Sequence, residues 1–201
     1  MKWLSSFLVK PMKHLIAKAI QESIELKTAL LKTHVPLIEK AARLIFDCLK
    51  SGHKVLFFGN GGSASDSQHL AAEFVGRYEK ERRGLPAIAL TTDTSILTAV
   101  ANDYGFERIF ERQIEALGNR GDVAFGISTS GNSKNVLLAV AKAKALGLVT
   151  IGLSGRSGGE MDSQVGLSIV VPSDKTARIQ ESHIMIGHIL CECVDELWTS
   201  Q

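Results

Sequence analysis

After Gly52 the sequence alternates between short apolar runs and longer helical stretches, and this alternation constrains the fold more than any other feature. The apolar runs predict five strands, at residues 55–58, 87–90, 123–127, 149–153 and 167–171. The stretches between and after them predict helices near residues 63–79, 95–102, 107–118, 132–146 and 176–198. Repeated strand–helix units give parallel strands joined by right-handed crossovers. The sequence therefore predicts an α/β fold, a doubly wound five-stranded parallel sheet with helices on both faces.

The residues before Gly52 show helical periodicity instead of this alternation. Two helices are predicted between about residues 12 and 52, with Pro36 in the first turn of the second helix and Gly52 closing it. We expect a tail at residues 1–13, a helical segment at 14–52 and an α/β domain at 53–201, which together form one structural domain overall. The N-terminal helix is amphipathic, but so small a domain offers it little to pack on, so a partner subunit is its expected cover.

Composition excludes several classes of protein. The 23 basic and 21 acidic side chains give a net charge of +2, which provides no argument for a nucleic-acid partner. No segment approaches the ~20 apolar residues of a membrane helix. The apolar stretch at residues 3–9 ends at Lys10-Pro11 without a small-residue cleavage site. The three cysteines have no framework spacing and predict no disulfide scaffold. We expect a soluble, cytoplasmic protein with no membrane partner.

Two small, hydroxyl-rich turns follow the first and third predicted strands. They are Asn60-Gly61-Gly62-Ser63 and Ser128-Thr129-Ser130-Gly131-Asn132-Ser133, and each opens a predicted helix. In doubly wound sheets ligands bind beyond the carboxyl ends of the strands, and a helix N-terminus favours an anion. A capped turn is the alternative, but a cap needs one or two such residues. The second turn therefore predicts phosphate binding, and the pair of turns predicts a sugar-phosphate ligand.

The first turn also fits the dinucleotide pattern G-x-G-x-x-G/A, as Gly59-x-Gly61-x-x-Ala64. That pattern expects an acidic residue about 20 positions further on, at the end of the second strand. Here the acidic residue that follows the second predicted strand is Asp93, well beyond that distance, and a dinucleotide would leave the second turn unused. The phosphate loop G-x-x-x-x-G-K-[ST] is absent as well. We therefore expect no nucleotide cofactor.

Two helices carry candidate acid–base groups. His69, Glu73 and Arg77 follow one another at four-residue spacing, so the predicted helix 63–79 places them on one face. Apolar neighbours indicate that this stripe is partly buried, although a solvated ladder of charges is the alternative. The last helix carries His188 in an apolar stretch, where a packed histidine is the alternative to a catalytic one. A carboxylate and an imidazole near a sugar phosphate would suit aldose–ketose isomerisation, which moves a proton between neighbouring carbons.

In combination, these motifs resemble the sugar isomerase (SIS) domain proteins, and among them the phosphoheptose isomerases. The resemblance covers residues 14–198 and is carried by Phe58-Gly59-Asn60-Gly61-Gly62-Ser63-Ala64, His69-x-x-x-Glu73, Ala101-Asn102-Asp103, Ser128-Thr129-Ser130-Gly131-Asn132-Ser133 and Arg178-Ile179-Gln180-Glu181-x-His183. It implies isomerisation of D-sedoheptulose 7-phosphate to D-glycero-D-manno-heptose 7-phosphate through an enediol, the first step towards the ADP-heptose of the lipopolysaccharide core. It also implies a homotetramer with active sites at subunit contacts.

The resemblance also implies roles for matching residues. Glu73 would be the general base and His188 its acid–base partner. The phosphate would be held by Ser128, Thr129, Ser130 and Ser133. The other substrate-binding residues would be Asn60, Gly61, Gly62, Ser63, Glu73, Asn102, Asp103 and Gln180. One zinc ion per subunit would be bound by His69, Glu73, Gln180 and His188.

The last helix raises a question about this zinc set. Gln180 and His188 are eight residues apart, or roughly 12 Å along a regular helix. They could meet at one ion only by reaching towards each other or through a subunit contact. Some relatives carry an acid three residues before the glutamine, where this chain has Ala177. A role for that acid has no support here.

Other functions of the same fold remain as alternatives. One is a non-catalytic SIS-domain protein that associates with the replication initiator DnaA and lacks the catalytic pair, whereas this chain keeps Glu73 and His188. The second is another sugar-phosphate isomerase. The third is a sugar-sensing regulator, but regulators normally add a helix-turn-helix domain, and the N-terminal helices here contain no basic recognition helix.

Overall fold

The sheet of the computed structural model, which describes residues 12–200, has five parallel strands. Their order is β2-β1-β3-β4-β5, with every neighbouring pair parallel. The strands are β1 Val55–Gly59, β2 Ala87–Ala89, β3 Val123–Ser128, β4 Val149–Gly155 and β5 Leu167–Val171. Each lies where the sequence predicts a strand, so the doubly wound parallel sheet is confirmed.

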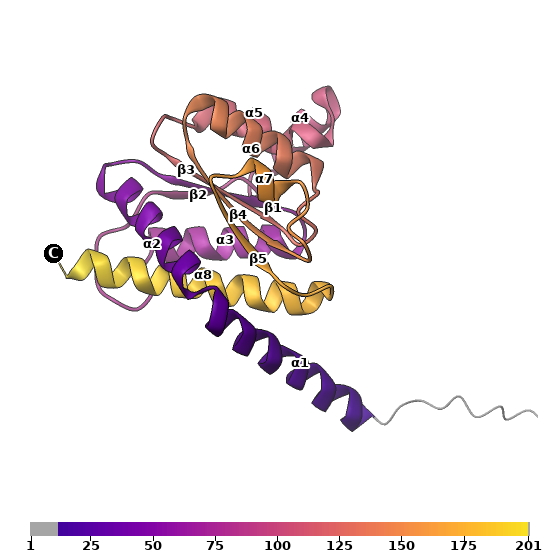
Figure 1. Cartoon of the computed structure of the whole chain (residues 1–201). Helices are drawn as coiled ribbons and strands as arrows, with labels where there is room; N and C mark the ends of the chain where they lie inside the picture. Colours follow the sequence, from indigo (N-terminus) through magenta and orange to yellow (C-terminus); the bar gives the residue numbers. More distant parts are fainter. Residues whose placement is uncertain (1–11, 201) are drawn as a thin grey trace, which may run out of the picture.

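Helices cover both faces of this sheet (Figure 1). They are α1 Met12–Thr33, α2 Val35–Lys50, α3 Gly62–Val75, α4 Thr94–Tyr104, α5 Ile109–Leu117, α6 Lys134–Leu146, α7 Met161–Gln164 and α8 Thr176–Thr199, with a short 3₁₀ helix, η1, at Phe106–Arg108. The one-turn helix α7 is not predicted from the sequence. No helix in the described part of the chain is long and apolar enough to cross a membrane.

The central strand β1 shows how the two layers form. Val55 and Phe57 point into a core shared with α2, α3 and α8, whereas Leu56 and Phe58 point into a core shared with α5 and α6. All four side chains are 0–1% exposed. Burying each one stabilises the fold by about 1.5–3 kcal/mol. A continuous apolar run is therefore what a strand covered on both faces requires.

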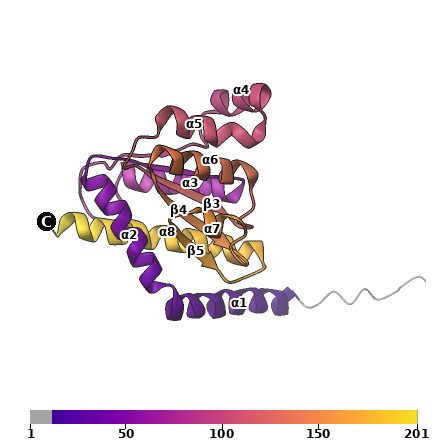
Figure 2. The ribbon, with the colours of Figure 1, turned by 45° about the horizontal axis from the view of Figure 1, so that its top comes forward.

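Helix α1 extends away from the rest of the molecule (Figures 1 and 2). Arg178 on α8 donates to the carbonyl of Ala19 at 2.7 Å, and Ser23 donates to Glu181 at 3.0 Å. Leu30 is the one residue of α1 that is buried, while Leu15, Ile16, Ile20 and Ile24 are each at least half exposed. The expected role of this apolar face in oligomerisation stays a prediction.

Helix α3 is shorter than the sequence predicts. It ends at Val75 rather than near residue 79, because the backbone of Gly76 leaves the helical conformation with ψ −114°. Arg77 therefore lies beyond the helix and pairs with Glu81 at 3.6 Å, so the expected three-residue stripe contains only His69 and Glu73.

The expected domain boundaries also stay predictions. Residues 1–11 of the predicted tail 1–13 lie outside the described residues, and α1 already begins at Met12.

Candidate active site

The two hydroxyl-rich turns meet at the point where the strand order of the sheet reverses. The chain leaves β1 for β2 on one side and later returns to β3 on the other side. The carboxyl ends of β1 and β3 are neighbours, with Gly59 paired to Ile127. In doubly wound sheets this switch point is where ligands bind. The structure thus confirms that both turns lie at one edge of the sheet, side by side.

Glycines shape both turns. A Cβ on Gly59 would lie 2.7 Å from the carbonyl oxygen of Ile127, so only glycine lets β1 turn this close to β3. Gly131 has φ +68°, and a Cβ there would collide with the carbonyl oxygen of Gly158. Asn60 and Asn135 then join the two turns through a reciprocal pair of amide hydrogen bonds, each 2.8 Å long. These hydrogen bonds therefore link the first turn to the start of α6, the helix that follows the second turn.

The polar groups of the second turn leave a helix N-terminus uncapped. The hydroxyl of Ser133 makes no capping bond to α6 and instead lies 2.9 Å from the hydroxyl of Ser128. Ser130 accepts a hydrogen bond from the backbone of Asn132 at 3.1 Å. Helix α3 likewise has no side-chain cap, because its N-cap residue is Gly61. Two helix N-termini of this kind attract a phosphate through their backbone dipoles.

His69, Glu73 and His188 form a second cluster, where α3 lies against α8. Nε2 of His69 is 3.0 Å from Oε1 of Glu73 and 3.3 Å from Nε2 of His188. Gly187 makes this approach possible, because a Cβ there would lie 2.6 Å from a methyl carbon of Leu70. The side chains of His69 and Glu73 are 47% and 25% exposed, so the cluster is open to solvent. The structure therefore brings together three of the four expected zinc ligands.

The chemistry of this cluster fits a zinc ion. One ligand atom from each of the three residues lies within 4.8 Å of the other two. Two imidazoles and one carboxylate are a donor set that zinc takes in catalytic sites, with the fourth position left for water or substrate. The two Nε2 atoms also face each other, and a neutral imidazole carries only one proton. A shared cation would satisfy both lone pairs at once.

Gln180 lies with the turns rather than with this cluster. Its amide is so close to Gly62 that a Cβ on Gly62 would collide with it. His69 is seven residues after Gly62 along α3, or roughly 10 Å away, so Gln180 does not lie at the cluster.

Asn102 and Asp103 lie in a third place, the last turn of α4, where the amide of Asn102 donates to Asp103 at 2.8 Å. Both are exposed, and α4 buries none of its residues. Within one chain the expected site thus divides into separate groups.

Two residues near the cluster are missing from the sequence-based set. Asp66 lies one turn before His69, and its Oδ2 is buried without a hydrogen-bond partner among the described residues. Burial raises the pKa of this carboxyl to about 6, and the nearby His69 lowers it in part.

The second residue is Tyr78, which follows α3. Its ring stacks on that of His188, with the ring centroids 5.7 Å apart. The spacing of Asp66 from His69 could have revealed it, but no pattern marks Tyr78.

Comparison with known proteins identifies the family. The SIS domain family matches residues 20–155. A phosphoheptose isomerase of Aquifex aeolicus is 57% identical over 182 residues, which cover 90% of this chain and 95% of that protein. The solved phosphoheptose isomerases of Neisseria gonorrhoeae and Francisella tularensis have TM-scores of 0.88 and 0.90 at 45% and 41% identity. Each comparison covers 92% of this chain, and 100% and 99% of those chains respectively.

The chain belongs to the phosphoheptose isomerase family of SIS-domain proteins. Members of this family are sugar-phosphate isomerases, so this chain belongs to a family of enzymes. Structural neighbours at 16–19% identity, with TM-scores of 0.60–0.67, show the fold alone.

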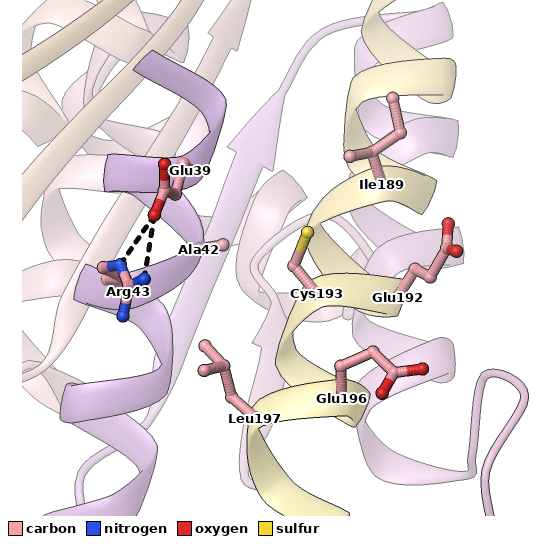
Figure 3. A pocket seen from close by; sticks show the side chains of 8 residues that line it. All are labelled: Glu39, Ala42, Arg43, Ile189, Glu192, Cys193, Glu196 and Leu197. Carbon is pink, nitrogen blue, oxygen red and sulfur yellow. Dashed lines mark hydrogen bonds and ion pairs between the residues drawn. The ribbon is translucent and has the colours of Figure 1, made fainter. Parts of the chain in front are cut away.

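A groove of about 410 Å³ lies between α2 and α8. Figure 3 shows Glu39, Ala42 and Arg43 of α2 on one side of it, and residues of α8 on the other side. Its lining contains none of the predicted catalytic, substrate-binding or metal residues. Ile189 and Cys193 give it apolar walls, and the pKa of the Cys193 thiol is raised by burial, which argues against a reactive thiolate.

Proposed function

We propose that this protein interconverts D-sedoheptulose 7-phosphate and D-glycero-D-manno-heptose 7-phosphate, the first step towards the ADP-heptose of the lipopolysaccharide core. The observation that carries this proposal is the contact between His69, Glu73 and His188, which come from two helices and offer a carboxylate and imidazoles at one exposed point. The membership of the phosphoheptose isomerase family supports the same substrate.

Glu73 and His188 would move the protons of the reaction. Glu73 takes a proton from C1 of the ketose while His188 donates one to the carbonyl oxygen on C2, which gives an enediol. Glu73 then returns its proton to C2 while His188 removes the proton of the O1 hydroxyl, so that the aldehyde forms at C1. No atom is gained or lost. Oε1 of Glu73 faces His69, which leaves Oε2 for proton transfer.

The turns at the switch point would hold the rest of the substrate. Ser128, Thr129, Ser130 and Ser133 surround the uncapped N-terminus of α6, which suits the phosphate. Asn60, Gly61, Gly62 and Ser63 open α3, and we assign them to the sugar. Gln180, which lies against Gly62, belongs to the same end of the site. Asn102 and Asp103 would contact the sugar from α4.

The zinc ion would be held by His69, Glu73 and His188, whose ligand atoms converge within 4.8 Å. When bound, zinc would supply Lewis-acid polarisation of the substrate oxygens. An atom that binds the ion cannot transfer a proton at the same time, so Glu73 and His188 would act as base and acid through the atoms that the ion leaves free. Gln180 would complete the set only if it came from another subunit, because in its own chain it lies roughly two turns of helix away from His69.

A homotetramer would resolve this separation. The exposed apolar residues of α1 and the lack of buried residues in α4 both support contacts with further copies of the chain. A neighbouring subunit could then add Gln180, Asn102 and Asp103 to the His–Glu–His cluster. Native mass spectrometry should give four chains per particle, and a monomer with full activity would contradict this assembly.

We place the reaction in the cytoplasm. The described residues include three cysteines, and all three are free thiols. Free thiols suit a reducing compartment, which is where sugar phosphates are made and used.

The decisive experiment incubates the purified protein with sedoheptulose 7-phosphate and follows the mixture by NMR. We expect the aldehyde-derived anomeric signals of the heptose 7-phosphate to appear. When the reaction is run in deuterated water, deuterium should enter C2 of the aldose, because the proton passes through a carboxylate that exchanges with solvent. No conversion at high enzyme concentration, with or without added zinc, would refute the proposal.

A further inference from the structure

An ion pair between Arg82 and Asp195 lies in the interior next to the His–Glu–His cluster. Nε of Arg82 is 2.5 Å from Oδ1 of Asp195, and the two side chains are 1% and 2% exposed. Burying two charges costs several kcal/mol of desolvation, and an apolar pair of the same volume is often at least as stable. A contribution to stability is therefore a weak explanation for the presence of this ion pair, and its contacts indicate a further role.

Arg82 holds the end of the helix that carries Glu73. Its guanidinium donates to the backbone carbonyls of Glu73 at 3.0 Å, Phe74 at 2.9 Å and Gly76 at 3.3 Å. The last carbonyls of a helix have no partners within the helix, and a cation there also matches the helix dipole. Arg82 thus fixes the final turn of α3, in which Glu73 lies.

Asp195, the other member of the ion pair, contacts the segment that follows α3. It lies on α8 seven residues, or two turns, after His188, so the two share one face of that helix. Its Oδ2 accepts hydrogen bonds from the backbone amides of Glu79 and Lys80, at 3.1 and 3.2 Å. These bonds fix the segment that follows α3, and this segment carries Tyr78, whose ring stacks on His188.

We propose that Arg82 and Asp195 are positioning residues for catalysis, which fix Glu73, His188 and Tyr78 relative to one another. This inference rests on the proposed roles of Glu73 and His188. One buried ion pair joins α3, α8 and the segment 76–85 through backbone groups at each end. A lysine in place of Arg82 would keep the charge but could not reach three carbonyls and a carboxylate at the same time.

The test compares kcat and KM in Arg82→Lys and Asp195→Asn with those of Asp122→Asn. Asp122 is 1% exposed and pairs with Lys54 at 2.5 Å, at the opposite edge of the sheet from the turns. It is therefore a matched buried carboxylate in an ion pair that lies away from the cluster. We expect kcat to fall by about 10- to 100-fold in the first two variants, because displacing a catalytic group by about 1 Å costs about 100-fold. Their KM should change less than threefold, and Asp122→Asn should keep its kcat.

Fluorine NMR gives a second measurement that needs no activity. The chain has two tyrosines, Tyr78 and Tyr104, so 3-fluorotyrosine labelling should give two resonances that Tyr78→Phe assigns. We expect the Tyr78 resonance to move in Arg82→Lys and Asp195→Asn, while the Tyr104 resonance stays in place. Asp122→Asn should move neither. This measurement also applies if one of the ion-pair variants is too unstable for kinetics, because Arg82→Lys and Asp195→Asn test the same contact separately.

The outcomes separate this inference from the proposed function. An inactive wild-type protein in which the Tyr78 resonance still depends on Arg82 would refute the proposed reaction but keep the structural link. An active wild-type protein whose kcat and Tyr78 resonance are unchanged in folded Arg82→Lys and Asp195→Asn would overturn the positioning role. A loss of kcat in Asp122→Asn equal to that in Asp195→Asn would also overturn it, because general destabilisation would then explain both.

Discussion

The turns at the switch point and the His–Glu–His cluster are built in different ways. Each turn is one short segment, and its shape depends on glycines and on backbone groups at the start of a helix. The cluster instead depends on two helices whose contacting histidines are 119 residues apart in the chain. The proposed ligand-binding turns are thus encoded locally, whereas the candidate chemistry depends on how distant helices pack.

This difference predicts two kinds of failure. Damage to a turn should weaken substrate binding, because the proposed function has the phosphate held by local amides and hydroxyls. Damage to the cluster should reduce turnover with little effect on binding, since the proton-transfer groups act mainly in the transition state. Substitutions in each region test whether substrate binding and turnover are lost separately.

Replacing Glu73 with glutamine should have the largest effect. The substitution keeps the shape of the side chain but removes the carboxylate that takes the proton. Acid–base groups contribute about 10²- to 10⁴-fold to rate, so kcat should fall within or beyond that range. Isothermal titration should still detect binding of the sugar phosphate.

The matched control is Glu81→Gln. The Glu81 side chain is 88% exposed and, among the described residues, pairs only with Arg77, so the kcat of this variant should equal that of the wild type. Full activity of Glu73→Gln would refute the assignment of the base. Loss of both binding and turnover would show that the cluster and the turns do not act separately.

Replacing Gly131 with alanine should have the second-largest effect, this time on binding. The new Cβ would collide with the backbone oxygen of Gly158, and φ +68° is costly for any residue with a Cβ. Overpacking and backbone strain together should cost about 2–4 kcal/mol, seen as a higher KM and a lower melting temperature.

Gly52→Ala is the control for backbone strain. Gly52 has φ +82°, but a Cβ there would meet nothing within 4 Å. This variant should lose only about 1 kcal/mol of stability and keep the KM of the wild type. An equal rise of KM in both variants would show that strain alone, and not the shape of the phosphate turn, is responsible.

Much of the fold and one of the two regions could be predicted from the sequence. All five strands lie where apolar runs predict them, because strands covered on both faces are uniformly apolar. The turns are equally visible, because glycine and hydroxyl residues mark the place where the backbone must approach a ligand. Local sequence patterns are therefore sufficient to predict the strands, the turns and the class of ligand, a sugar phosphate.

The rest depends on contacts that no local pattern contains. The end of α3 is set by Gly76 together with Arg82, and this is why the predicted helix is too long and Arg77 is misplaced. The stacking of Tyr78 on His188 depends on the ion pair between Arg82 and Asp195. The approach of His188 to His69 depends on Gly187, a residue that has no local signature of its own.

His183 lies on α8, five residues before His188, and should make stability depend on pH. It is 1% exposed, and its Nε2 donates to the carbonyl of Ser154, which lies beside Ser128 in the sheet. Burial lowers the pKa of His183 to about 4, whereas the unfolded value is 6.5. Above pH 6.5 His183 is neutral in both the folded and the unfolded protein, so its titration does not change the free energy of unfolding. As the pH falls from 6.5 to 4, the unfolded state binds the proton first, and stability drops by up to about 3 kcal/mol.

Urea unfolding at pH 7.5, 5.5 and 4.5 measures this effect. His183→Gln keeps a donor for Ser154 but cannot be protonated, so its free energy of unfolding should fall less than that of the wild type over this range. The comparison uses the difference between the two proteins, because carboxyl groups elsewhere titrate equally in both. Parallel curves for the two proteins would contradict the assignment to His183.

Replacing Ser133 with alanine should have the smallest effect and is the finest test of the separation. The hydroxyl lies 2.9 Å from that of Ser128 and makes no capping bond, so its loss should leave α6 intact. One hydrogen bond contributes about 0.5–1.5 kcal/mol, which corresponds to a rise in KM of about 2- to 12-fold. Ser163→Ala, at an exposed serine whose hydroxyl donates to the carbonyl of Glu160, should change neither constant. A fall in kcat without a rise in KM would mean that the turn takes part in the chemistry, because a hydrogen bond equally strong in ground and transition states cannot change turnover.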